Sequence, residues 1–124
     1  MKKPRRYITN ARETLRKSPV IDNIYIDVKY VKSAFGIAYL GVSEVVNEYL
    51  LAGGLTRKDL PKKVEEYEKA LRKYGGVRNG KLLRQFSVLY DELHIAGYYR
   101  GLLRNANLVK DALKNAEDFI GKLK

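Results

Sequence analysis

The sequence predicts an all-α protein, an up-down antiparallel bundle of about five helices that forms a single domain over residues 1–124. Apolar residues recur every three or four positions through most of the chain, which is the spacing of one helix face. Gly, Pro and Asn interrupt the pattern at helix-length intervals. No segment alternates apolar and polar residues as a half-buried strand does, and short connections favour antiparallel neighbours.

The first helix is expected over residues 4–17, because proline suits a first helical turn and Ser18-Pro19 ends the segment. An apolar connector over residues 20–25 follows, and one interpretation lays it across the bundle as a lid. The buried face of the helix is expected to hold Tyr7, Ile8, Ala11 and Leu15.

The second helix, over residues 27–51, is expected at the centre of the bundle because it is apolar around most of its circumference. Asp27 is the expected N-cap, and Gly53-Gly54 ends the helix since glycine adopts the left-handed cap conformation readily. Small side chains would let another helix approach closely, and they belong to Ala34, Ala38 and Gly41.

The remaining helices follow from capping and glycine signals. The third begins at a capping box of Thr56 and Asp59, has Pro61 in its first turn, and ends before Gly75-Gly76. The fourth is expected from residue 79 or 80 to 96, with a loop between Gly97 and Gly101. The fifth begins near Asn105 or Asn107, and its buried face holds Leu108, Val109, Ala112, Leu113, Ala116, Phe119, Ile120 and Leu123.

Positive charge is concentrated at the start of the chain. The net charge is +11, and residues 1–18 hold seven Lys and Arg against one acid, Glu13. A field of this sign attracts polyanions such as RNA, DNA or an acidic partner. The apolar face of this helix is thin for insertion into a bilayer, so no membrane contact is expected. The candidate contact residues are Lys2, Lys3, Arg5, Arg6, Arg12, Arg16 and Lys17.

Composition excludes several site classes. The absence of cysteine rules out disulfides, thiolate zinc sites and a cysteine nucleophile. With one histidine and no HExxH spacing, neither a metal nor a cofactor is expected. The longest apolar stretch, residues 34–51, contains polar residues typical of a buried helix, and no apolar segment follows the basic N-terminus. These features predict a cytoplasmic protein.

Two groups of residues are candidate sites, and each also has a purely structural interpretation. His94 has Tyr90, Asp91 and Tyr98 as helical neighbours, and an imidazole beside a carboxylate can act as a general base. The alternative is packing at the end of a core helix. Exposed tyrosines beside arginine stack on bases or anchor an interface, whereas the alternative is an aromatic plug under the bundle. This second candidate comprises Tyr98, Tyr99, Arg100 and Arg104.

Two segments carry a family resemblance: residues 29–42 (KYVKSAFGIAYLGV) and 89–99 (LYDELHIAGYY), followed by the Ala112/Ala116/Phe119/Ile120 helix. The chain resembles a small family of uncharacterised bacterial helical-bundle domains and, more loosely, the HEPN superfamily. The HEPN resemblance implies an up-down bundle, frequent dimers and, in active members, RNA cleavage by an Arg followed four to six residues later by His. Here nine residues separate Arg84 from His94, and Arg100 follows the histidine.

The resemblance therefore implies a non-catalytic member, an accessory or partner-binding module often encoded beside a nucleotidyltransferase. We expect a self-associating or partner-binding protein with no enzymatic activity of its own. One alternative is an RNA- or DNA-binding module that uses the first helix with Arg100 and Arg104. Another is a degenerate ribonuclease that uses His94 with Arg100.

Overall fold

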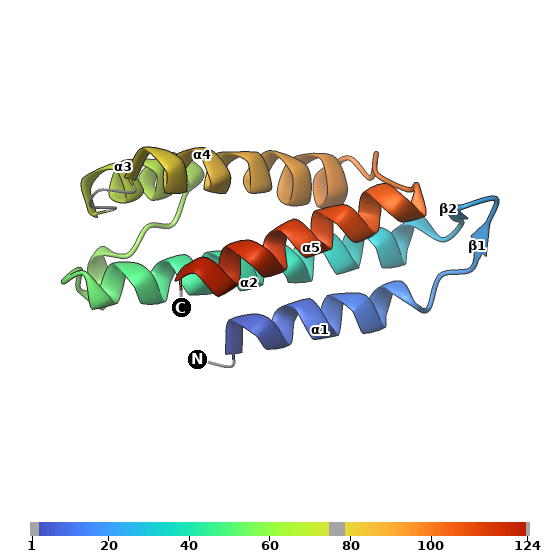
Figure 1. The fold of residues 1–124 in the computed structure, drawn as a ribbon, viewed down its shortest axis with the longest axis horizontal. Coiled ribbons are helices and arrows are strands. Elements are labelled where there is room, and N and C mark those ends of the chain that lie inside the picture. Colours follow the sequence, from blue (N-terminus) through green and yellow to red (C-terminus); the bar gives the residue numbers. More distant parts are fainter. Residues whose placement is uncertain (1–2, 75–78, 124) are drawn as a thin grey trace.

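The computed structural model describes residues 3–74 and 79–123, and it confirms the all-α bundle (Figure 1). Helices α1 and α4 run in one direction along the bundle, and α2 and α5 run in the other (Figure 1). None of the described helices is both long and apolar enough to cross a bilayer. The main helices are α1 (Lys3–Leu15), α2 (Val28–Ala52), α3 (Val64–Tyr74), α4 (Asn79–Leu89), the π-helix η3 (Tyr90–Tyr99) and α5 (Ala106–Leu123).

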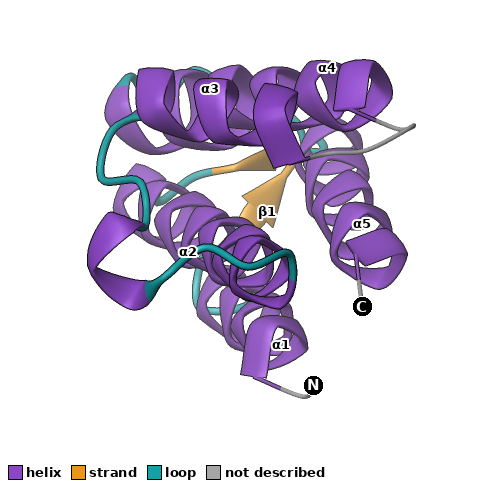
Figure 2. Cartoon of the chain, turned by 90° about the vertical axis from the view of Figure 1, so that its left-hand side faces the viewer, coloured by secondary structure: helices purple, strands orange, loops and turns teal. Residues whose placement is uncertain are grey.

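Helix α2 is the centre of the bundle, as its apolar circumference predicts. It packs against α1, α3, α5 and η3. In Figure 2, α1 lies below α2, α5 lies to its right, and α3 and α4 lie above. The buried residues of α2 are spread along its whole length, and they are Val31, Ala34, Phe35, Ala38, Gly41, Val42, Val45, Val46 and Leu50.

Helix α1 approaches α2 closely at Gly41. A Cβ atom there would lie 2.8 Å from the Cβ of Tyr7 and 2.9 Å from the backbone oxygen of Pro4. A larger residue would therefore push the helices apart, because packed interiors do not absorb added volume without strain. The expectation that small residues on α2 admit a neighbouring helix is confirmed at this position.

Helix η3 interlocks with α2 through a glycine and a ring on each side. A Cβ at Gly97 would lie 2.6 Å from Cδ2 of Phe35, and a Cβ at Gly36 would lie 2.8 Å from Cδ1 of Tyr98. The prediction that Gly97 begins a loop is wrong, because the helix continues through Tyr99. This glycine makes room for Phe35 and does not form a turn.

Residues 20–25 form a β-hairpin, so the expectation that the chain contains no strand is wrong there. Strand β1 (Val20–Ile21) pairs antiparallel with β2 (Ile24–Tyr25) at one end of the bundle (Figure 1). The turn has φ values of 51° at Asp22 and 64° at Asn23, which these two residue types tolerate better than most. Each strand is too short to give a readable alternation.

The hairpin is joined to the segment before α5. The backbone N–H of Tyr25 donates to the carbonyl of Arg104 at 2.9 Å, and Ala106 N–H donates to Asn23 at 2.8 Å. Before α2, Asp27 occupies the N-cap position but makes no side-chain capping bond. Its own N–H donates to the buried hydroxyl of Ser18 at 2.9 Å instead.

The third helix begins later than predicted. Thr56 Oγ1 donates to Asp59 Oδ2 at 2.7 Å, but this pair closes only the 3₁₀ turn η1 (Arg57–Asp59). Helix α3 starts at Val64, where the Glu66 carboxylate accepts the N–H of Lys62 at 2.8 Å. The cap that starts the helix is thus a downstream glutamate. The predicted stop at Gly75-Gly76 lies outside the described residues.

An ion pair ties α1 to α5. The guanidinium of Arg12 reaches both carboxylate oxygens of Glu117, at 3.1 and 3.3 Å. The hydrogen bond from Arg12 is the main cause that lowers the pKa of Glu117 below its usual 4.5. Both side chains are about one-third exposed, at 37% and 34%, so solvent weakens the pair.

We predict that Gly97→Ala lowers the free energy of unfolding by about 1–3 kcal/mol, because the added methyl overlaps the Phe35 ring. The matched control is Gly80→Ala in α4, where the nearest atom to an added Cβ is Arg84 Nη1 at 3.5 Å. Urea unfolding measures both. Equal stability of the two variants would contradict the close packing of Gly97 against Phe35.

We also predict that Glu117→Gln destabilises the protein by less than about 1 kcal/mol at neutral pH. The lowered pKa of Glu117 means that its stabilising effect is present above pH 4.5 and is lost as the pH falls through the folded value. The gap between wild type and variant should therefore narrow in acid. Glu13→Gln makes the same charge change at an exposed position of α1 and is the control. A gap that widens in acid contradicts the ion pair.

Candidate functional site

His94 lies in a cluster of tyrosine rings. The centroid of its imidazole is 4.9 Å from that of Tyr39, 5.2 Å from Tyr90 and 5.8 Å from Tyr98. Residues 90, 94 and 98 all come from η3, so the helix places a ring from every fourth position along one line. π-Helical segments are rare and are frequent at functional sites.

Tyr39 links this cluster to the core. Its ring lies 6.5 Å from that of Phe86, which in turn lies 5.5 Å from the ring of Tyr67. Burial raises the pKa of Tyr39 to about 12, against a smaller opposing effect of the hydrogen bond with Ser43. Burial likewise raises the pKa of Tyr67, whose hydroxyl donates to Asn47 Oδ1 at 2.9 Å. Both phenols are therefore neutral at physiological pH.

Two adjoining hollows of about 610 and 530 Å³ open beside these rings. Both are lined by Tyr39, Leu40 and His94, which makes them one continuous depression. We call it the central groove. Its lining comes from α2, from η3 and from the first residues of α3 and the two before it, together with Tyr7 of α1. No residue of α5 lines it. Its charged lining residues balance, and they are Lys62, Lys63, Glu44 and Glu65.

Apolar side chains in the central groove are open to solvent. Leu40 is 53% exposed and Tyr98 is 44% exposed, although Phe35 on the same helix as Leu40 is fully buried. Ile37 is half-buried beside them. The groove therefore presents apolar surface that the rest of the described chain does not cover.

The neighbours predicted for His94 are confirmed only in part. Tyr98 stacks on it and the Tyr90 ring lies tilted against it, whereas Asp91 is exposed and forms no ion pair with it in the described residues. Tyr39 completes the cluster from α2, and sequence reasoning missed it because the contact depends on tertiary packing. No group of three metal-ligating side chains occurs within residues 3–74 and 79–123.

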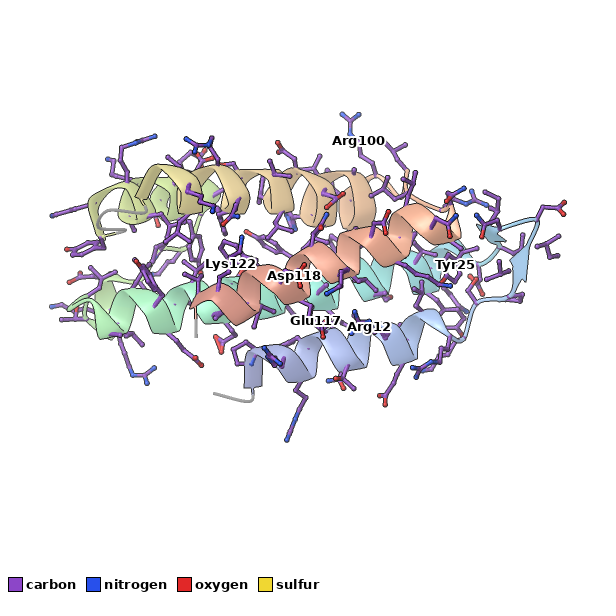
Figure 3. The ribbon with its side chains drawn as sticks, viewed as in Figure 1. Arg12, Tyr25, Arg100, Glu117, Asp118 and Lys122 are labelled. Atoms are coloured by element: carbon purple, nitrogen blue, oxygen red, sulfur yellow. The ribbon has the colours of Figure 1, made fainter. Side chains whose placement is uncertain are left out.

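The second candidate, Tyr98 to Arg104, does not form one site. Tyr98 belongs to the central groove, but Tyr99 is 72% exposed and does not line it. Arg100 ends η3 through its backbone, with its N–H donating to Ile95 at 2.9 Å, and its side chain points away from the bundle (Figure 3). Arg104 is exposed in the segment joined to the hairpin.

The basic residues of the first helix do not form one site either. Arg12 is engaged with Glu117, while Arg5 and Arg16 line hollows along the seam between α1 and α5. Figure 3 shows Arg12 and Glu117 facing each other across that seam.

Among the described side chains, Arg6 and Lys17 do not line the seam hollows. Arg6 and Lys17 are exposed, and the Lys17 ammonium lies 5.9 Å from the centroid of the Tyr30 ring. Lys2 lies outside the described residues, as does the side chain of Lys3.

Glu92 is a titratable group that sequence reasoning did not single out. Burial, and then the charge of Asp111, raise its pKa, while a hydrogen bond with Asn115 opposes the shift. One of its carboxylate oxygens is buried without a hydrogen-bond partner. Because Glu92 does not line the central groove, its raised pKa reflects packing against α5 and assigns it no chemistry there.

The fold and sequence resemble proteins of unknown function. The solved structure of a "protein of unknown function from Dyadobacter fermentans" matches with a TM-score of 0.78 and 31% identity, over 97% of this chain and 88% of that chain. No curated protein matches the sequence. Neither finding bears on HEPN likeness, which stays a prediction. Because a family model matches all of residues 1–124, the chain belongs to the family described as "Domain of unknown function (DUF5618)".

Proposed function

We propose that the protein is a non-catalytic module that pairs with a second copy of itself through the central groove. The observation that carries the proposal is apolar surface in a preformed depression, where Leu40 is 53% and Tyr98 is 44% exposed. Association removes such surface from water, and aromatic side chains in pockets supply much of the binding energy of interfaces.

Charge favours a second copy as the occupant. Two molecules with a net charge of +11 repel each other, so they associate best where the surface is neutral. The lysines and glutamates of the central groove balance. In a twofold-symmetric pair, Lys62 and Lys63 of one copy can face Glu44 and Glu65 of the other, which a self-complementary interface requires.

The surroundings of His94 support a binding role over catalysis. Its ring packs against three tyrosine rings and makes no ion pair in the described chain. A general base needs a group that orients it and access to the proton it removes. Arg100, the partner in the ribonuclease alternative, points out of the bundle (Figure 3).

We predict that wild type is a dimer and that Leu40→Glu raises its dissociation constant about tenfold or more, because a buried unpaired carboxylate costs several kcal/mol. Leu108→Glu is the matched control, since this leucine is 55% exposed on α5. Analytical ultracentrifugation measures both variants, and circular dichroism checks their folding. A monomeric wild type, or equal weakening by both substitutions, contradicts the proposal.

A second test separates binding from catalysis. Wild type and His94→Ala are incubated with single-stranded RNA, and products are resolved on a gel. We expect no cleavage by either protein. Cleavage by wild type that His94→Ala abolishes would contradict the proposal of a non-catalytic module and favour the degenerate ribonuclease.

A further inference from the structure

A second depression follows the seam between α1 and α5, apart from the central groove. It consists of hollows of about 490 and 610 Å³ that share Lys114. We call it the basic groove. Figure 3 shows Arg12 and Glu117 facing each other across this seam, with Asp118 and Lys122 farther along α5. The cations that line it are Arg5, Arg12, Arg16, Lys110, Lys114 and Lys122.

The acids of the basic groove leave an excess of positive charge. Arg12 pairs with Glu117, and Lys114 pairs with Asp118, each at 3.1 Å. Asp111 is the third acid that lines the groove. The four other cations form no ion pair within the part of the chain that the structure describes, and they are Arg5, Arg16, Lys110 and Lys122.

The shape and spacing of these charges fit a linear polyanion. Helix α5 has 18 residues, which at about 1.5 Å per residue makes it about 27 Å long. Arg16 and Lys110 line one hollow of the groove, and Arg5 and Lys122 line the other. A row of cations in a groove of this kind is how single-strand-binding proteins follow a phosphate backbone.

The lining also argues against a lipid surface as the ligand and against recognition of nucleic-acid bases by stacking. Insertion into lipid needs exposed aliphatic groups, but Leu15 is 4% and Leu113 is 1% exposed. Base stacking needs an open aromatic ring, but Tyr25 is 5% exposed. What the groove offers a ligand is charge.

We infer that the basic groove binds the phosphate backbone of a single-stranded nucleic acid without reading its sequence. This surface does not depend on self-association through the central groove. It also differs from the sequence-based expectation, because α5 contributes Lys110 and Lys122 while Arg100 and Arg104 do not line it.

The test is fluorescence anisotropy with a labelled oligouridylate of about 16 nucleotides, the upper end of known site sizes. Titrations at several salt concentrations give the salt slope. Four phosphate contacts at about −0.7 each predict a log–log slope of about −3. The double variant Arg16→Glu/Lys110→Glu should weaken binding about tenfold or more and reduce the slope to about −1.4.

The control is Lys58→Glu/Lys69→Glu, which makes the same change in net charge at exposed positions on η1 and α3. We expect it to bind nearly as tightly as wild type. An equal loss of affinity in the two double variants would assign binding to net charge and overturn the inference that the basic groove is the binding site. Absence of binding by wild type at low salt, or equal affinity for polyglutamate, would also overturn the inference.

Discussion

The close approach of α2 and η3 at Gly97 and Phe35 governs the arrangement of the central groove. Because a side chain at residue 97 would overlap the Phe35 ring, only glycine lets η3 lie this near α2. At the same contact, Gly36 makes room for Tyr98, which stacks on His94. The rings that form the groove wall are therefore positioned by two glycines, and the π-helical turns carry them in one line.

The faces of the bundle differ in charge because different helices form them. The central groove lies along α2, whose sequence is mostly apolar, and its charged lining residues balance. The lining of the seam between α1 and α5 has more lysine and arginine than acidic residues. A neutral apolar face suits a second copy of a strongly basic chain, and a cationic seam suits a polyanion. The two proposed surfaces share no lining residue.

Most of the helical architecture was predictable because helix periodicity is a local signal. The buried faces of α2 and α5 lie where the pattern places them, except that Leu108 of α5, which was predicted to be buried, is 55% exposed. Glycine was ambiguous: Gly53 does follow the last residue of α2, but Gly97 serves packing within a helix. The hairpin was missed because two-residue strands leave no alternation, and its position depends on hydrogen bonds to residues near 105.

The candidate site was harder to predict than the fold. Tyr90, His94 and Tyr98 could be grouped from their spacing, since all three lie on one helix. Tyr39 could not, because it meets them only after α2 and η3 pack. Among the arginines, the sequence does not distinguish Arg12, which pairs with Glu117, from Arg16, which does not. That distinction depends on which helix faces each side chain.

The proposed self-association through the central groove can be tested directly, because the chain has no cysteine and a single introduced cysteine accepts one nitroxide label. Ser33→Cys places the label on a residue that lines the groove, and Asn107→Cys places it on α5, which does not line it. Double electron–electron resonance then gives the distance between labels in the dimer. The account predicts a shorter distance for Ser33→Cys than for Asn107→Cys. The reverse order, or no dipolar coupling with the label at position 33, would contradict it.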